Sequence, residues 1–337
     1  NGGTLSIAVV GATGAAVPGA TVSIQNSATA PTVSFTTFSD SLGFVQLPGA
    51  PTSTEYRIEV SKDGYSSAQT YLRDATNQNP TPGYLTVAKG QTTTSTFAID
   101  ALAPFTLSTF SPIRATTTTD TFASATGLST QSGTTVTGGS LRLATGLDGY
   151  ELSGTARGVS VAPQYLAAWN QLTGTLSVPS GTSALVRVTD SAGALLPDAV
   201  LPGNSAGFSS FPISLAGVAT STYPALALSA ALTTTTTTTT SQILDWAVSY
   251  DEGPIPLPNV AFTLTGAKRM GTTGAGAPIY KTVIASTTGA SAVFSSSLEW
   301  DVYTISGLSL TVLTASSTPT PFTVDPGTAF DATLILE

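Results

Sequence analysis

Hydrophobic and polar residues alternate over many short stretches of this chain. Near its start, Leu5, Ile7 and Val9 alternate with polar or small residues, and residues 20–24 and 56–60 repeat the pattern. Alternation with a period of two is typical of β-strands that bury one face. Glycine- and proline-containing turns separate these stretches. The pattern therefore predicts an all-β chain.

One order of strands and turns occurs twice along the chain. Segments near the C-terminus match segments of the first hundred residues in character, which predicts two copies of one fold. The matched pairs are 257–264 with 17–24, 287–289 with 41–43, 301–305 with 55–59, and 327–335 with 90–99.

The second copy lacks a first strand in the expected place. Nothing just before Gly253 corresponds to residues 4–10, whereas residues 105–110 do, about 140 residues upstream. Insertion of a domain into a loop of the second copy explains this gap, because loop tips tolerate whole domains. We expect one β-sandwich over residues 1–101, a second over 102–111 plus 252–337, and an inserted domain over 112–251.

The turn motifs of the first copy carry a family resemblance. Residues 18–24, 40–45 and 56–65 resemble carboxypeptidase-regulatory-like domains, which are transthyretin- or immunoglobulin-like sandwiches found as spacers in bacterial surface proteins. The resemblance implies a scaffold rather than a chemistry.

The last strand expected in the insert carries a second resemblance. Residues 243–250, preceded by 226–232, resemble the end of galactose-binding-like jelly rolls, with leucine, aspartate and tryptophan followed by valine and tyrosine. This resemblance implies a β jelly roll, a fold that in some proteins binds sugars through its loops.

The order of all three domains resembles extracellular pilin-like proteins of candidate-phylum bacteria. In that family an N-terminal hydrophobic helix anchors or polymerises the protein. The chain begins at Asn1, so we expect such an upstream segment to have been removed. The segments that carry the resemblance are 4–10, 48–51, 62–65, 77–83, 97–100, 262–268 and 298–303.

Composition narrows the classes of function. Charged residues make up 9% of the chain and the formal net charge is -8, so no basic patch is available for nucleic acid or an anionic membrane. Neither cysteine nor histidine occurs, which excludes thiol chemistry and removes the commonest general base and metal ligand. We predict no cofactor and no metal site, although calcium bound by oxygen ligands stays open. An extracellular or cell-surface location fits best, with a cytoplasmic protein of unusual composition as the alternative.

Four residues are candidates for a glycan site. Tyr165 and Trp169 are predicted to form a platform on which a sugar stacks, and Arg187 and Asp190 to hydrogen-bond it. Packing of the aromatic rings beneath a loop is the alternative interpretation.

Three other motifs have structural alternatives that we favour. Asp148 and Glu151 suggest a glycosidase pair, but closeness in sequence does not give the geometry of such a pair, and a solvated turn explains them better. The eight threonines of 233–240 fit a strand or loop better than a glycosylated or ice-binding surface. Asp245 and Trp246 fit a surface aspartate beside a core tryptophan.

The sequence therefore predicts a non-catalytic structural subunit of an extracellular bacterial appendage, such as a pilus-like filament, or of a surface layer. Its partners would be copies of itself in a homo-oligomer, joined through exposed edge strands, with the jelly roll displayed outward. A membrane would be reached only through a segment absent from this chain. A glycan-binding module for cell adhesion is the alternative, and a surface glycosidase is a remote one.

Overall fold

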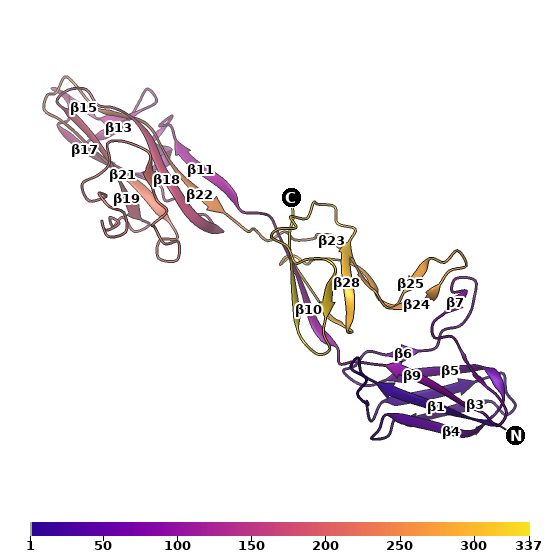
Figure 1. Ribbon diagram of the computed structural model, residues 1–337. Coiled ribbons are helices and arrows are strands. Elements are labelled where there is room, and N and C mark those ends of the chain that lie inside the picture. Colours follow the sequence, from indigo (N-terminus) through magenta and orange to yellow (C-terminus); the bar gives the residue numbers. More distant parts are fainter. Residues whose placement is uncertain (1) are drawn as a thin grey trace. The chain divides into compact units, whose positions relative to one another are not determined.

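A computed structural model describes residues 2–337 (Figure 1). Its described elements are β-strands apart from one short 3-10 helix, Ala125–Gly127, which confirms the all-β prediction. Over this range no helix is long and apolar enough to span a membrane. The chain forms two compact units, and the second of them is Ser111–Ile255. The first combines the residues up to Phe110 with Pro256–Glu337.

The N-terminal part of the first unit contains two sheets, which we call the first sheet pair. Their strand orders are β4-β1-β9 and β3-β2-β5-β6, with β8 also paired to β5. Alternate residues such as Leu5, Ile7 and Val22 are fully buried between the sheets, as the period of two requires. The strands are β1 (Gly3–Val10), β2 (Thr21–Asn26), β3 (Val33–Phe38), β4 (Phe44–Ala50), β5 (Ser53–Ser61), β6 (Ala68–Gln69), β8 (Leu85–Val87) and β9 (Thr92–Ala98).

The C-terminal part of this unit repeats the same strand order in a second sheet pair, with orders β27-β10-β30 and β26-β23-β28-β29. Strand β10 pairs antiparallel with β27 and parallel with β30, as β1 pairs with β4 and β9. The pairing expected of residues 105–110 is therefore confirmed. The strands are β10 (Ala103–Phe110), β23 (Ala261–Gly266), β26 (Val283–Thr287), β27 (Val293–Leu298), β28 (Asp301–Ser306), β29 (Phe322–Val324) and β30 (Phe330–Ile335).

The repeat extends to buried side-chain hydrogen bonds. The Ser39 hydroxyl accepts from the amide of Ala20 at 2.9 Å, and Thr288 accepts from Val260 at 3.0 Å. The fully buried Tyr56 donates to the carbonyl of Pro51, and Tyr303 donates in the same way to Glu299. A buried hydroxyl must find a partner, and both copies use the same solution.

The match of 287–289 with 41–43 is wrong. Gly43 has φ 79° and accepts from the amide of Val9, whereas its counterpart is Ala292, with φ 61°, which accepts from Thr109. The match assumed that glycine would recur at this left-handed position. The second copy has alanine at this position, so the glycine of 287–289 occupies a different place in the turn from Gly43.

A small three-stranded sheet joins the two sheet pairs. Strand β7 (Asn79–Pro80), from a loop of the first pair, lies beside the hairpin of β24 (Arg269–Thr272) and β25 (Pro278–Tyr280) from the second. Side-chain amides reinforce the contact, because Asn77 donates to the carbonyl of Met270 and Asn79 to the hydroxyl of Thr272, both at 3.1 Å. The two copies are therefore tied by backbone pairing.

The second unit, Ser111–Ile255, has two larger sheets around a core of its own. One sheet has the order β13-β14-β22-β18-β20 with β11 also paired to β22, and the other has the order β12-β17-β21-β19. The strands are β11 (Arg114–Asp120), β12 (Leu128–Ser132), β13 (Thr134–Val136), β14 (Leu141–Leu143), β17 (Ser153–Gly158), β18 (Leu166–Ser177), β19 (Thr182–Asp190), β20 (Ile213–Ser214), β21 (Leu226–Thr234) and β22 (Gln242–Glu252), with a small hairpin of β15 (Thr145–Gly146) and β16 (Gly149–Tyr150).

The threonine run has a structural place. Thr233 and Thr234 end β21, and the remaining threonines form the connection to β22. The carbonyl of Thr237 accepts from the amide of Tyr150 at 2.8 Å, which fixes this connection against the small hairpin. The strand-or-loop interpretation of the run is confirmed.

Candidate functional site

Trp169 is a core residue. Its side chain is 1% exposed, and its indole Nε1 donates to the carbonyl of Tyr223 at 2.8 Å. The ring also meets Tyr250 edge-on, with 5.7 Å between the ring centroids. A sugar cannot stack on a ring that is covered in this way. The structure contradicts the stacking-platform prediction for Trp169 and supports the packing alternative.

The other three candidates are not gathered into one site. Tyr165 is half-buried just before β18, and its hydroxyl accepts from the side chain of Gln164. Arg187 and Asp190 lie on β19, in the sheet opposite to β18. None of the three lines the cavity beside β11 that is described below.

Arg187 and Asp190 both serve the local backbone. The Arg187 guanidinium donates to the carbonyls of Ser205 and Ala206 at 3.1 and 3.2 Å. One oxygen of Asp190 accepts from two amides of the turn that follows β19, each at 2.9 Å. A glycan role for Tyr165, Arg187 and Asp190 stays a prediction.

Asp148 and Glu151 lie in and just after the β15–β16 turn, and both are exposed. Within residues 2–337 no group of three or more carboxylates, histidines or cysteines is placed to hold a metal ion. The solvated-turn interpretation describes the positions of both carboxylates.

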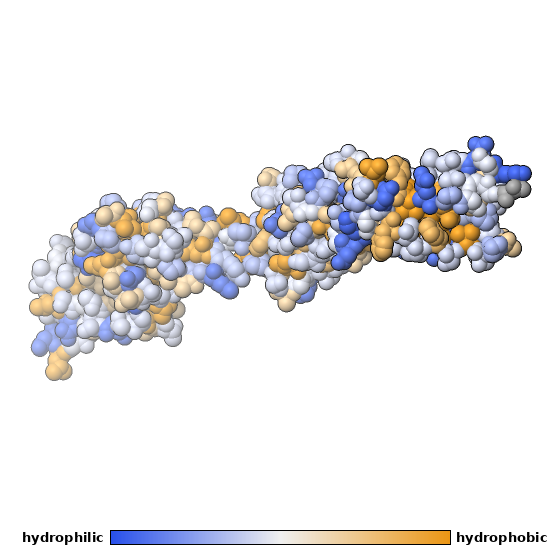
Figure 2. All heavy atoms as spheres, turned by 90° about the horizontal axis from the view of Figure 1, so that it is seen from below, coloured by the Kyte–Doolittle hydropathy of each residue, from blue (hydrophilic) through white to orange (hydrophobic). Residues whose placement is uncertain are grey.

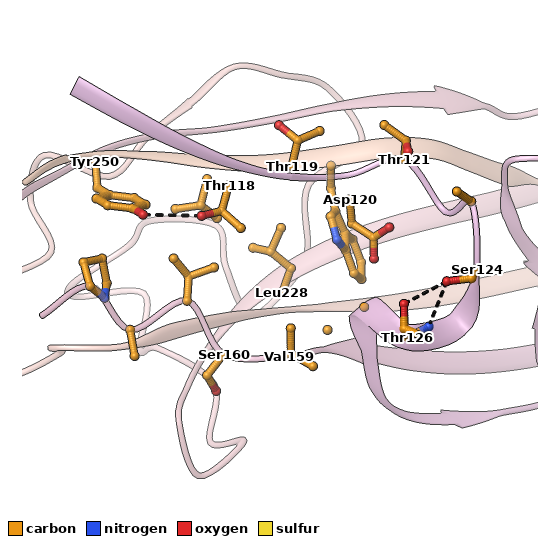
Figure 3. A pocket seen from close by; sticks show the side chains of 18 residues that line it. Thr118, Thr119, Asp120, Thr121, Ser124, Thr126, Val159, Ser160, Leu228 and Tyr250 are labelled. Atoms are coloured by element: carbon orange, nitrogen blue, oxygen red, sulfur yellow. Dashed lines mark hydrogen bonds between the residues drawn. The ribbon is translucent and has the colours of Figure 1, made fainter. Parts of the chain in front are cut away.

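A cavity of about 530 Å³ lies beside β11 (Figure 3). Its floor consists of core side chains from β21 and β22, namely Leu228, Trp246, Val248 and Tyr250. Its rim carries hydroxyl groups from β11, from the 3-10 turn and from the segment after β17, namely Thr118, Thr119, Thr121, Ser124, Thr126 and Ser160. Of the described strands, β11 pairs only with β22, so the cavity lies at an edge where one sheet ends.

Asp120 supplies the carboxylate of the cavity. Oδ1 accepts from the amide of Phe122 at 2.8 Å, whereas Oδ2 is buried without a hydrogen-bond partner. In Figure 3 the side chain points from β11 toward the 3-10 turn, where it lies so close to Gly127 that a Cβ there would collide with it. A buried acceptor without a donor costs about 1–3 kcal/mol.

Phe122, which lies between the rim residues Thr121 and Ser124, has a strained backbone conformation. Phe122 has φ 51°, an uncommon conformation for a bulky residue, and its side chain is fully buried. Its ring meets Trp246 in a T-shaped contact with 5.1 Å between the centroids. Strained residues cluster at functional sites, and this one supports the tryptophan of the cavity floor.

Exposed apolar side chains occur at the end of β3, at the start of β4 and in the connection between these strands. Phe38 and Leu42 are each 69% exposed, and Phe44 is 44% exposed. We call these three residues the apolar connection. Figure 2 shows hydrophobic residues on the face of the first sheet pair seen from below.

A charged cluster lies between the two sheet pairs of the first unit. Oε2 of Glu299 accepts from Lys281 at 2.7 Å and from Lys268 at 3.3 Å. Burial raises the pKa of Glu299, but the hydrogen bond and charge of Lys281, the charge of Lys268 and the hydroxyl of Thr282 outweigh it, so the pKa is lowered. Glu299 is therefore ionised, and it links the turn between β27 and β28 to the two connecting segments that carry Lys268 and Lys281.

Sequence reasoning missed the cavity. Its rim comes from residues 118–126 and 160, and its floor from residues 228 and 246–250. Asp120, a carboxylate that ends a run of threonines, is the sequence feature that could have pointed to the rim. Trp246 is buried at 4% exposure, which confirms its core assignment, yet it also lines the cavity.

Solved structures to which the chain is similar include bacterial pilins, all with low scores. BcpA, the major pilin subunit of Bacillus cereus, is 9% identical, with 100% of each chain covered and a TM-score of 0.21. The Bacillus anthracis TIE protein is 9% identical over 100% of this chain and 51% of that one, with a TM-score of 0.23. The Corynebacterium diphtheriae major pilin SpaA is 8% identical over 98% and 99%, with a TM-score of 0.18.

TM-scores of this size describe no shared overall arrangement, and we draw no functional conclusion from them. No curated protein matches the sequence. The family comparison is specific, however. Residues 4–100 match the model of the carboxypeptidase regulatory-like domain, so the first sheet pair is a domain of this kind.

Proposed function

We propose that the chain is a non-catalytic structural subunit of an extracellular bacterial appendage, pilus-like, or of a surface layer. The observation that carries this proposal is the pairing of β7 with β24, which ties two copies of one sandwich into a single compact unit. Domains of the family matched by the first copy are scaffolds, and a second copy joined by strand pairing makes a longer scaffold of the same type.

Side-chain contacts strengthen the tie between the copies. Lys281 donates to the carbonyl of Ser67 at 2.6 Å while it holds Glu299 at 2.7 Å. Asn77 and Asn79 add two hydrogen bonds to the paired backbones. A flexible linker would leave the copies free to move, whereas these contacts resist bending of the kind that a filament or lattice experiences.

We further propose three modules: residues 1–101, residues 102–111 with 252–337, and an inserted jelly roll over 112–251. Three separate hydrophobic cores support this division. The orders β14-β22-β18-β20 and β17-β21-β19 support a jelly roll. Phe110 and Pro256 are bridged, so the chain leaves and re-enters the second sandwich at neighbouring points, as display of an outward module requires.

Self-association would use the exposed edge of the first sheet pair. Strands β3 and β4 are edge strands of their sheets, and the apolar connection lies between them. Exposed apolar side chains beside unpaired strand edges favour contact with a second copy.

Electron microscopy of the native material tests this proposal. We expect filaments or a lattice at the cell surface, and loss of ordered assembly in the double variant Phe38→Ser, Leu42→Ser. The control is Leu147→Ser, which removes a fully exposed leucine from the β15–β16 turn. Monomers of the wild-type chain under all native conditions would refute the structural role.

A glycan-binding adhesin is the second candidate, and the cavity beside β11 favours it. No observation favours the surface glycosidase, because Asp148 and Glu151 are exposed and lie away from that cavity. Adhesion of wild-type cells to a glycan-coated surface, compared with cells that lack this chain, distinguishes the adhesin from a purely structural subunit.

A further inference from the structure

We propose that a pocket at the junction of the two sheet pairs binds a phosphate group, either as the free ion or as a phosphate monoester. This junction pocket, of about 240 Å³, lies entirely within the first compact unit. The first sheet pair lines it with residues 68, 69, 71, 81, 82 and 96–98, and the second with Lys268, Arg269 and Lys281. The inference goes beyond the structural role and does not depend on it.

The size of the junction pocket suits a small ion. Its volume of about 240 Å³ lies below the usual range for sites that take drug-sized molecules. The cationic side chains are within reach of solvent, because Arg269 is exposed and the side chains of Lys268 and Lys281 are 27% and 21% exposed. A dissolved ion can therefore enter without prior rearrangement of the core.

Positive charge gathers in this pocket. Three of the eleven basic residues of the chain line it, in a protein whose net charge is -8. The β24–β25 hairpin brings them together, since the amide of Lys281 donates to the carbonyl of Lys268 at 2.8 Å and Arg269 is the next residue. Neither aspartate nor glutamate is among the described residues that line the pocket. The lining therefore has the charge that favours an anion.

The nearby carboxylates do not neutralise all of this charge. Glu299 accepts from both Lys268 and Lys281, but it lines a neighbouring cavity and not this one. Asp301 is 6% exposed, and its oxygens accept from backbone amides. The Arg269 guanidinium has no hydrogen-bond or ion-pair partner among residues 2–337. One complete cationic fork is therefore available to a ligand.

Neutral donors from the first sheet pair complete the lining. The hydroxyls of Tyr71 and Thr81 and the side-chain amide of Gln69 have no hydrogen-bond partner among the described residues. Burial and the charge of Glu299 raise the pKa of Tyr71, so its hydroxyl keeps the proton that it can donate.

The number of donors favours phosphate over carboxylate. A guanidinium binds either group through two parallel hydrogen bonds. A carboxylate offers two oxygens in one plane, whereas a phosphate group offers at least three strong acceptor oxygens that point in different directions. The junction pocket has donors from both copies, so we expect it to prefer the group that can accept from both.

A phosphate group held in this way would strengthen the contact between the copies. Thr81 lines the pocket, and its amide donates to the carbonyl of Met270 across the β7–β24 pairing at 2.9 Å. A ligand that needs both copies in place binds the closed interface alone, so it reduces the open population by the factor 1 + [L]/Kd. Hydrogen exchange of the Thr81 amide should therefore slow about tenfold at a phosphate concentration of ten times Kd.

Calorimetry of the full chain with sodium phosphate, glycerol 3-phosphate and malonate, at ionic strength matched with sodium chloride, tests the inference. We expect saturable binding of phosphate at one site, with malonate at least tenfold weaker. Binding of glycerol 3-phosphate as well would assign the site to phosphate groups carried by larger molecules, and its absence would assign it to the free ion. No saturable binding of phosphate, or equal affinity for malonate, overturns the proposal.

A variant and its control locate the site. Arg269→Gln removes the unpaired guanidinium and should weaken phosphate binding at least tenfold. Lys89→Gln, which removes an exposed positive charge outside the pocket, should leave the affinity unchanged. Wild-type affinity in folded Arg269→Gln protein, as judged by its thermal transition, would show that phosphate binds elsewhere.

Hydrogen exchange tests the link between the copies separately. Saturating phosphate should slow exchange at Thr81 but leave unchanged the amide of Val186, which donates to Phe208 in the other compact unit. Binding with no change at Thr81, or with equal slowing at both amides, would refute a phosphate group that joins the two copies.

Discussion

The amine of Lys281 lies 2.7 Å from Oε2 of Glu299 and 2.6 Å from the carbonyl oxygen of Ser67. One side chain therefore links a carboxylate of the second sheet pair to the backbone of the first. The Glu299 side chain is 8% exposed and that of Lys281 is 21% exposed, so water screens the pair only in part. This contact and the pairing of β7 with β24 make the interface between the two copies specific.

Glu299→Gln is expected to destabilise the first unit by about 2 kcal/mol at pH 7, because two lysines lose their shared counter-charge. The pKa of Glu299 is lowered in the folded protein, so its stabilisation is complete above the pKa of the unfolded chain, about 4.3. It is lost as pH falls through the folded pKa. The difference in unfolding free energy between wild type and variant should therefore shrink below about pH 4.3, as measured by urea denaturation.

Glu59→Gln provides the matched control. Its partner Arg57 lies 3.7 Å away, and both side chains are about half exposed. An exposed pair of this kind contributes about 0–1 kcal/mol. A Glu299 variant as stable as the Glu59 variant at pH 7 would mean that the Lys281 contact contributes little.

Ala292→Gly is expected to stabilise the protein by about 1 kcal/mol, because alanine there has φ 61° and glycine adopts this conformation without strain. Gly43→Ala, at the equivalent position, should destabilise it by more than that, since the new Cβ would collide with the carbonyl of Val9. Thermal unfolding of both variants measures the effects. A loss of stability in Ala292→Gly would contradict the equivalence of the two turns.

Gly271→Ala is expected to separate β7 from β24 without unfolding either core. A Cβ at Gly271 would collide with the side chain of Asn77 and contact the backbone of Asn79. The amide of Thr81 donates to Met270 across this pairing at 2.9 Å, so its hydrogen exchange should rise at least tenfold.

Gly276→Ala is the control for this change. It lies in the same hairpin with φ 81°, but no atom lies within 4 Å of its would-be Cβ. Exchange at Thr81 should stay as in the wild type. An equal rise in both variants would point to general loosening of the hairpin instead of loss of the strand pairing.

Trp169→Ala is expected to cost about 3–5 kcal/mol of unfolding free energy, the usual range for a buried tryptophan. Tyr165→Ala, at a half-buried position before β18, should cost clearly less. Chemical denaturation of the full chain, followed by fluorescence, measures both. A Trp169 variant of wild-type stability would show that the ring is not part of the core.

The alternation of hydrophobic and polar residues along the sequence determined most of the fold. Leu5, Ile7 and Val9 are buried because a strand presents every second residue to one face, and this can be read without knowing the partner strand. The repeated strand order likewise identified β10 as the first strand of the second copy, far from the rest of it in sequence.

Only the tertiary structure decided the contacts made between elements. Asp120, Ser160 and Trp246 come together because β11 pairs with β22 and the segment after β17 lies across the edge, and no local period encodes that arrangement. The same holds for Asn77 beside Gly271 and for Ala292 in the place of Gly43. Alternation reports which face of a strand is buried, whereas a site depends on which distant segments cover that face.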